Sequence, residues 1–144
     1  MVGLGDVEGG IRFNIARAVS ANGRVVVGEA YLPGDFISAF SWNAESGMVA
    51  LPGYNPDDST RGALGVSSDG SIIVGFGQDT SGQAAAYWDA TGIHRLQDRL
   101  AALGAPVDGW QLQRATAITP DGTTIVGFGI SPAGELMAWI AVLP

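Results

Sequence analysis

Residues 64–75 read LGVSSDGSIIVG, and related stretches stand at residues 17–28 (RAVSANGRVVVG) and 116–127 (TAITPDGTTIVG). The glycine that closes each Asn-Gly or Asp-Gly pair falls at Gly23, Gly70 and Gly122, so successive copies are 47 and 52 residues apart. Repeats of this length are typical of solenoids, propellers and arrays of small structural units. The repeat therefore sets the phase in which the rest of the chain is interpreted.

Each copy predicts a β-hairpin, because two apolar runs flank an Asn-Gly or Asp-Gly pair, and both residues of such a pair tolerate the positive φ of a type I′ turn. Further turn signals divide the remainder of each repeat into short strands. We expect strands at residues 16–20, 24–30, 37–42 and 48–51; at 63–67, 71–76, 84–88 and 93–96; and at 111–119, 123–129 and 135–142.

The regular pattern is interrupted after the second repeat. Leu96, Leu100 and Leu103 have helical spacing, and Gly104 with Pro106 supplies a stop signal. The sequence therefore predicts a short helix at residues 97–103.

The expected fold is all-β and β-propeller-like, with three four-stranded antiparallel blades per chain and one short helix near 97–103. Residues 1–6 resemble residues 48–53, the last strand of the first repeat, so we expect them to complete a blade. We interpret residues 1–144 as one repeat domain, made of the strand at 1–6, blades at 16–53, 62–96 and 111–142, and a helical insert at 97–110.

Tryptophans recur with nearly the same period. Trp42 and Trp88 are 46 residues apart, and Trp88 and Trp139 are 51 apart. We expect these rings to fill the interfaces between neighbouring blades, where a buried aromatic side chain removes about 150–250 Å² from water. A ligand-stacking role is the alternative.

Composition narrows the function. The chain has 144 residues, of which 47% are hydrophobic, and its net charge is −7. The acidic balance argues against nucleic acid or anionic membranes as partners.

There is no cysteine, which excludes disulfides, thiolate metal sites and a cysteine nucleophile. We see no signal peptide at the start of the chain and no apolar run of membrane-spanning length, so no membrane insertion is expected.

The ionisable residues suggest no catalytic motif. Asp69 and Asp121 lie in the repeated turns, where aspartate commonly caps its own backbone, and their spacing does not fit a calcium loop. His94, the single histidine, has no nucleophile motif beside it and is expected to face solvent. We therefore expect no metal and no cofactor. Hydrolysis by paired carboxylates, for example Asp57 with Asp58, stays open.

The loop at residues 55–61 is the most polar segment between two repeats. Loops at the rim of a rigid scaffold often carry binding sites. The candidate ligand-binding residues are Asn55, Asp57, Asp58 and Arg61, together with Trp110. A solvated linker is the simpler alternative.

The segments AVSANGRVVVG (18–28), AFSW (39–42) and GMVALPG (47–53) closely resemble the bacterial HAF-type extracellular repeat, and the likeness covers nearly the whole chain. The segment 109–118 also resembles the final unit of that family. The resemblance implies secreted or cell-surface proteins without defined catalytic residues. Residues 118–122 are more weakly similar to TolB-type propeller repeats.

Three blades are too few to close a propeller, which generally has four or more. We therefore expect a homodimer that forms a six-bladed ring, with exchange of the N-terminal strands, or a longer parent protein that supplies the remaining blades. The favoured function is a non-catalytic binding or structural module that recognises a glycan, a peptide or a surface partner. The alternative is a carbohydrate-active hydrolase or lyase with carboxylates at the channel mouth.

Overall fold

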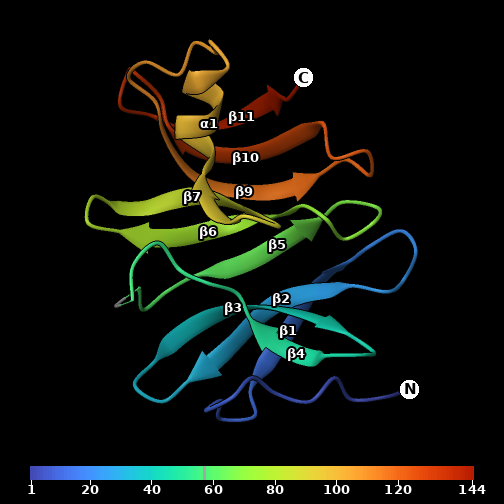
Figure 1. The fold of residues 1–144 in the computed structure, drawn as a ribbon. Coiled ribbons are helices and arrows are strands. Elements are labelled where there is room, and N and C mark those ends of the chain that lie inside the picture. Colours follow the sequence, from blue (N-terminus) through green and yellow to red (C-terminus); the bar gives the residue numbers. More distant parts are fainter. Residues whose placement is uncertain (57) are drawn as a thin grey trace.

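The computed structural model describes residues 1–56 and 58–144, which form three antiparallel sheets stacked one on the next in chain order (Figure 1). The first sheet contains β1 (Asn14–Val19), β2 (Val26–Leu32), β3 (Phe36–Asn43) and β4 (Gly47–Ala50). The second contains β5 (Gly62–Val66), β6 (Ile73–Asp79), β7 (Gly82–Asp89) and β8 (Gly92–Arg95), and the third contains β9 (Gln111–Ile118), β10 (Thr124–Ile130) and β11 (Leu136–Val142).

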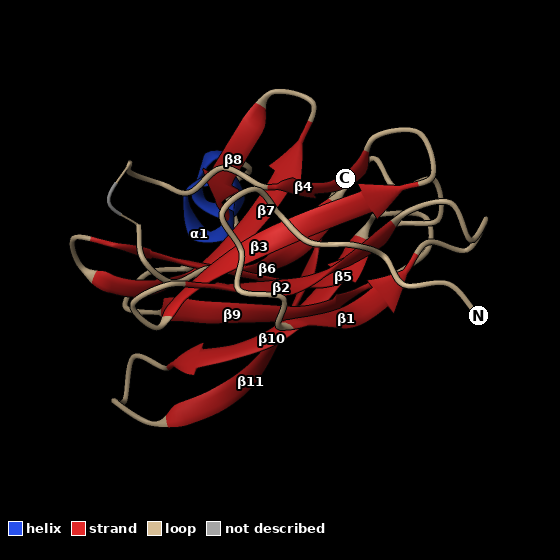
Figure 2. Ribbon diagram, turned by 90° about the horizontal axis from the view of Figure 1, so that it is seen from below, coloured by secondary structure: helices blue, strands red, loops and turns tan. Residues whose placement is uncertain are grey.

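The prediction of an all-β fold is confirmed, but the three sheets do not close into a propeller. In each sheet the strands follow one another in sequence order. The first strands β1, β5 and β9 lie beside each other, and the two ends of the chain lie at opposite ends of the stack (Figure 1). Figure 2, seen from below, shows the strands of the three sheets overlying one another.

The helix is also confirmed: α1 covers Leu96–Ala102, within one residue of the prediction, and packs against β7, β8 and β9. Its apolar side buries Leu96 and Leu100. In the described part of the chain, no helix is long and apolar enough to cross a bilayer.

The predicted strand at residues 1–6 is not observed. In the single chain these residues, all of them described, pair with no strand. The third sheet consequently has three strands, and β11 is the edge strand on the side where β4 and β8 lie in the other two sheets.

The repeated turns differ from the type I′ geometry predicted for them. Gly23, Gly70 and Gly122 have φ of 69°, 80° and 75°, but the Asn or Asp before each has a negative φ. Each glycine N–H instead donates to the carbonyl of the Ser or Thr three residues earlier, as Gly70 does to Ser67 at 3.1 Å. The two residues before each glycine, such as Ser68 and Asp69, are therefore the central pair of the turn, and only the glycine that follows them takes the left-handed conformation.

The turns of the three sheets are joined to one another. The backbone N–H of Ser68 donates to the Pro120 carbonyl at 2.8 Å, and that of Asn22 approaches the Ser68 carbonyl at 3.4 Å. Direct hydrogen bonds between the turns therefore hold this end of each sheet against the next.

A second set of glycines is required by close contact. At Gly28, Gly75 and Gly127, an added Cβ would collide with the backbone carbonyl of Ile15, Gly62 or Arg114 on the adjoining first strand. The first strand of every sheet carries a bulge near this point. A bulge increases the local strand twist, and here it presses a carbonyl onto the neighbouring glycine.

The core lies between the sheets. Trp88 is 3% exposed between the first and second sheets, and its indole N–H donates to the Pro52 carbonyl at 2.8 Å. This confirms the predicted role for Trp88. The register differs for the third tryptophan: Trp42 and Trp88 pair with Val26 and Ile73, whereas Trp139 pairs with Gly127, the position that Phe40 occupies in the first sheet.

We expect Gly75→Ala to destabilise the protein by about 3 kcal/mol, because a rigid backbone carbonyl occupies the space that the new methyl group needs. Urea unfolding measures this. Ala50→Val adds bulk to an exposed strand position and should change the unfolding free energy by less than about 0.5 kcal/mol. Equal effects of the two substitutions would contradict the proposed steric cause.

Candidate functional site

The predicted binding loop runs from β4 to β5 along one rim of the stack. Its described residues are tied to β3: the Ile37 N–H donates to the Ser59 carbonyl at 3.0 Å, and the Arg61 N–H donates to the Ile37 carbonyl at 2.9 Å. Ile37 and Thr60 form a parallel bridge. Residues 59–61 of the loop are therefore bonded to β3. Asp57, one of the predicted residues, lies outside the described part of the chain.

Asp58 points into the protein. It is 8% exposed, and its carboxylate accepts hydrogen bonds from the backbone N–H groups of Tyr54 (3.2 Å), Thr60 (3.3 Å) and Gln78 (3.3 Å). Through Gln78 it joins the loop to β6. This carboxylate is a structural anchor, and Asp58 also lies in the walls of the two clefts beside the loop.

Arg61 is likewise used inside the loop. Its guanidinium donates to the carbonyls of Leu51 and Asp58, both at 2.8 Å. Burial lowers the pKa of this group, and the nearby Asp58 carboxylate partly offsets the effect. Tyr54, at the start of the same segment, donates its phenolic hydrogen to the Ala85 carbonyl at 3.1 Å, and burial raises the pKa of the phenol.

Two clefts flank the anchored loop. One, of about 430 Å³, is mainly polar, and its walls include Asn55, Gln78 and Thr80. The other, of about 560 Å³, is lined by Phe36, Leu32 and Arg61 among others. Asn55 is thus placed as predicted, at an open surface. Sequence reasoning missed Gln78 and Phe36, which come from other strands; a half-exposed phenylalanine beside a turn is not a distinctive sequence signal.

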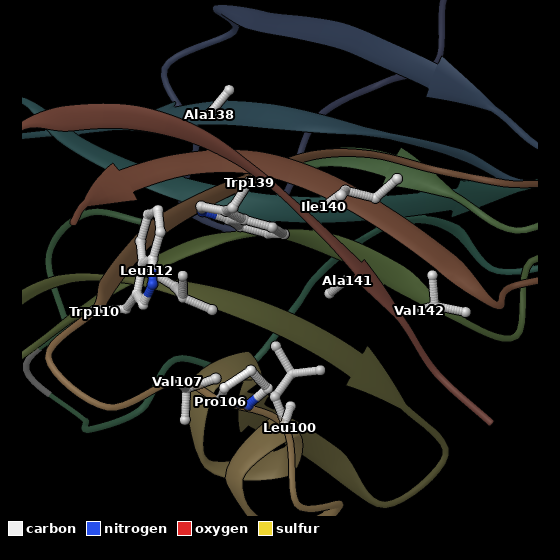
Figure 3. A pocket seen from close by; sticks show the side chains of 11 residues that line it. Leu100, Pro106, Val107, Trp110, Leu112, Ala138, Trp139, Ile140, Ala141 and Val142 are labelled. Carbon is white, nitrogen blue, oxygen red and sulfur yellow. The ribbon is translucent and has the colours of Figure 1, made fainter. Parts of the chain in front are cut away.

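Trp110 does not belong to these clefts. It lines a separate pocket of about 450 Å³ between α1, the segment that follows the helix, and β11 (Figure 3). The walls of this pocket are apolar and include Leu100, Val107 and Trp139 (Figure 3). The prediction that Trp110 joins the loop in one site is therefore not supported by the geometry.

His94 is better packed than predicted. Its imidazole stacks on the Tyr87 ring with centroids 4.8 Å apart, and its side chain is 35% exposed. Nε2 lies 2.8 Å from the Thr91 hydroxyl and 3.1 Å from Asp89. In a catalytic triad the carboxylate and the hydroxyl contact opposite ring nitrogens. Here both contact the same nitrogen, so this cluster lacks the arrangement of a triad.

The acids of the repeated turns cap the backbone, as the sequence analysis expected. Asp69 Oδ1 accepts from the Ser71 N–H at 3.0 Å, the Ser71 hydroxyl at 2.7 Å and the Ser67 hydroxyl at 2.9 Å. Asp121 and Asn22 make the corresponding contacts. Among the described residues, no three His, Asp or Glu side chains lie close enough together to hold a metal ion.

The hydrogen bonds at these turns change the acidity of the carboxylates. Donation chiefly from the Ser71 hydroxyl lowers the pKa of Asp69 from 3.8 to about 2. Donation chiefly from the Thr119 hydroxyl lowers the pKa of Asp121 from 3.8 to about 2. The hydrogen bonds of the turns therefore stabilise the ionised form of both carboxylates.

No protein-family model matches this chain, and no curated protein was found to be similar to it. The resemblance to HAF-type repeats stays a prediction from the sequence.

We expect Asp58→Ala to lower the free energy of unfolding by about 1–3 kcal/mol, because it removes the acceptor for three N–H groups near the core. Asp58→Asn keeps one carbonyl oxygen and should cost less. Thermal or urea unfolding tests this. A wild-type stability for Asp58→Ala would mean that the carboxylate does not anchor the loop.

The turns predict an acid-sensitive component of stability. Because the folded pKa of Asp69 and Asp121 lies below the unfolded value, ionised turns stabilise the fold above about pH 4, and this contribution is lost as the pH falls toward 2. In the double variant Asp69→Asn and Asp121→Asn, unfolding midpoints should fall less steeply over that range. Asp108→Asn, outside the turns, is the control and should keep the wild-type slope.

Proposed function

We propose that this protein is a non-catalytic binding module of the β-propeller type, which recognises a glycan, a peptide or a surface partner at the two rim clefts beside residues 55–61. The observation that carries the proposal is the hydrogen bonding of the described part of this loop to β3 and β6, with open clefts on both sides. Binding surfaces that are already positioned lose little conformational entropy when a ligand arrives.

The chemistry of the clefts suits a ligand with both polar and apolar faces. The Phe36 side chain is 48% exposed in one cleft, and the amides of Asn55 and Gln78 line the other. An aromatic ring can stack on the apolar face of a sugar or on a peptide side chain, while amides both donate and accept hydrogen bonds. The net charge of −7 disfavours a polyanionic ligand.

The geometry of the ionisable groups supports binding over catalysis. Asp58 and Asp79 both line the polar cleft. Asp58 and Arg61, however, make hydrogen bonds to the backbone, and Asp79 is held by the Ser81 N–H at 2.7 Å and by Arg95 at 3.2 Å. The alternative, a carbohydrate-active hydrolase or lyase, requires a carboxylate that is free to act on substrate. No contact of the described residues specifically favours that alternative.

The cellular location is proposed from the sequence resemblance alone. HAF-type repeats imply an extracellular or cell-surface protein, and exposure to glycans and surface partners there would suit a rim-binding module.

Glycan and peptide arrays, together with a hydrolase panel, test this function. We expect binding without turnover, and a loss of affinity of at least about tenfold in Phe36→Ala and in Gln78→Ala, which is about 1.4 kcal/mol each. Val49→Ala, at an exposed position away from both clefts, should bind normally. Turnover abolished by a single Asp→Asn or Glu→Gln change would instead favour the hydrolase or lyase.

A further inference from the structure

Equivalent residues of the three sheets differ sharply in exposure. Val27, Val74 and Val126 occupy the same position in the second strand of each repeat, opposite Ser41, Tyr87 and Ile140. Val27 and Val74 are 0% exposed because the next sheet covers them, whereas Val126 is 38% exposed. The outer face of the third sheet is therefore equivalent to the faces of the first and second sheets that the next sheet buries.

This face continues onto the edge strand β11. Leu136, Ile140 and Val142 are 66%, 70% and 69% exposed. β11 also carries no outer neighbour in the described structure, whereas β3 pairs with β4 and β7 pairs with β8. Exposed, apolar edge strands are open to pairing with another strand. The apolar pocket beside Trp110 runs along this same edge and is lined by residues from Ala138 to Val142 (Figure 3).

Met1–Leu4 is the segment whose sequence fits the missing position. It reads MVGL, against MVAL for residues 48–51, which contain most of β4. In the structure, Met1 and Val2 are exposed and the segment pairs with no strand. It lies at the opposite end of the stack from β11, so one chain does not bring the two together (Figure 1). A second copy of the chain can.

We propose that Met1–Leu4 of a second copy adds to β11 as an antiparallel fourth strand, and that the first sheet of that copy covers the outer face of β10 and β11. The receiving pocket on the third sheet shares no lining residue with the rim clefts. The partner is thus another copy of this chain.

The pairing of the first sheet defines the register. There Met48 lies opposite Trp42, Val49 opposite Ser41 and Ala50 opposite Phe40. Transferred to β11, this register places Met1 opposite Ala141, Val2 opposite Ile140 and Gly3 opposite Trp139.

Side-chain sizes agree with this register. The smallest residue of the added strand meets the largest of β11, since Gly3 lies opposite Trp139, and the long Met1 side chain meets the small Ala141. Met1 would then enter the apolar pocket beside Leu100 and Val107, while Val2 would lie on the outer face over Ile140.

Repeating the contact at the other end closes the assembly. Each of two copies gives one strand and receives one, so six sheets surround one axis and the edge of β11 is paired in both copies. The mass expected in solution is twice the 14.8 kDa of one chain.

Light scattering and disulfide trapping test the proposal. The chain has no cysteine, so the double variant Val2→Cys and Ile140→Cys contains just one pair of thiols per chain. Cα atoms of opposed strand residues are within disulfide range. We expect a dimer by light scattering and a covalent dimer on non-reducing gels. The matched control, Val2→Cys with Leu136→Cys, has equally exposed positions out of register and should not cross-link efficiently.

Three results would overturn the proposal: a monomer at all concentrations, a dimer that does not cross-link through positions 2 and 140, or equal cross-linking of the control.

A separate variant tests the covered face. Ile140→Asp should weaken dimerisation at least tenfold, and because Ile140 is 70% exposed in the single chain, the variant should fold normally. The control Val49→Asp, on the outer strand of the first sheet, should remain dimeric. If Ile140→Asp dimerised with unchanged affinity, the proposed interface would be refuted.

Discussion

A backbone carbonyl pressed against a glycine is the contact on which this architecture depends. It occurs in every sheet at the equivalent positions Gly28, Gly75 and Gly127, and a second time in the third sheet at Gly129; at each, a side chain would displace the neighbouring first strand. The bulge that creates the contact twists that strand locally. Because all three sheets have the same distortion at the same point, they have similar shapes and can stack face to face with one repeated geometry.

The repeated turns supply the second constraint. Within a turn, a hydroxyl and an Asx side chain satisfy backbone N–H groups, as Ser67 and Asp69 do; between turns, Ser68 donates directly to Pro120. Local and inter-sheet hydrogen bonds therefore meet in the same few residues. These structural contacts explain why the Asn-Gly or Asp-Gly turn sequence recurs in this chain. Because they occupy the turn side chains, few hydrogen-bonding groups are left for a ligand at the turns.

A stack of repeats has two ends, and here the ends are not equivalent. Val7 packs against Ala30 and Phe40 and partly covers the outer face of the first sheet, whereas the outer face of the third sheet stays open at Val126 and Ile140. Terminal repeats generally need a cap or a partner, because each unit buries its apolar face only against a neighbour. The exposed apolar surface of the described chain therefore includes the outer face of the third sheet.

The sequence by itself determined the number of sheets, the all-β class, the helix at Leu96–Ala102 and the structural use of Asp69 and Asp121, because these follow from local periodicity and turn chemistry. It placed Asn55 at an open rim but did not show that Asp58 turns inward, since that depends on Tyr54 and Gln78 from other segments. It also misassigned the turn type, the surroundings of His94 and the neighbours of Trp110. Only the tertiary structure decided these points and distinguished the buried Val27 and Val74 from the exposed Val126, because burial depends on which sheet lies alongside and not on the residue itself.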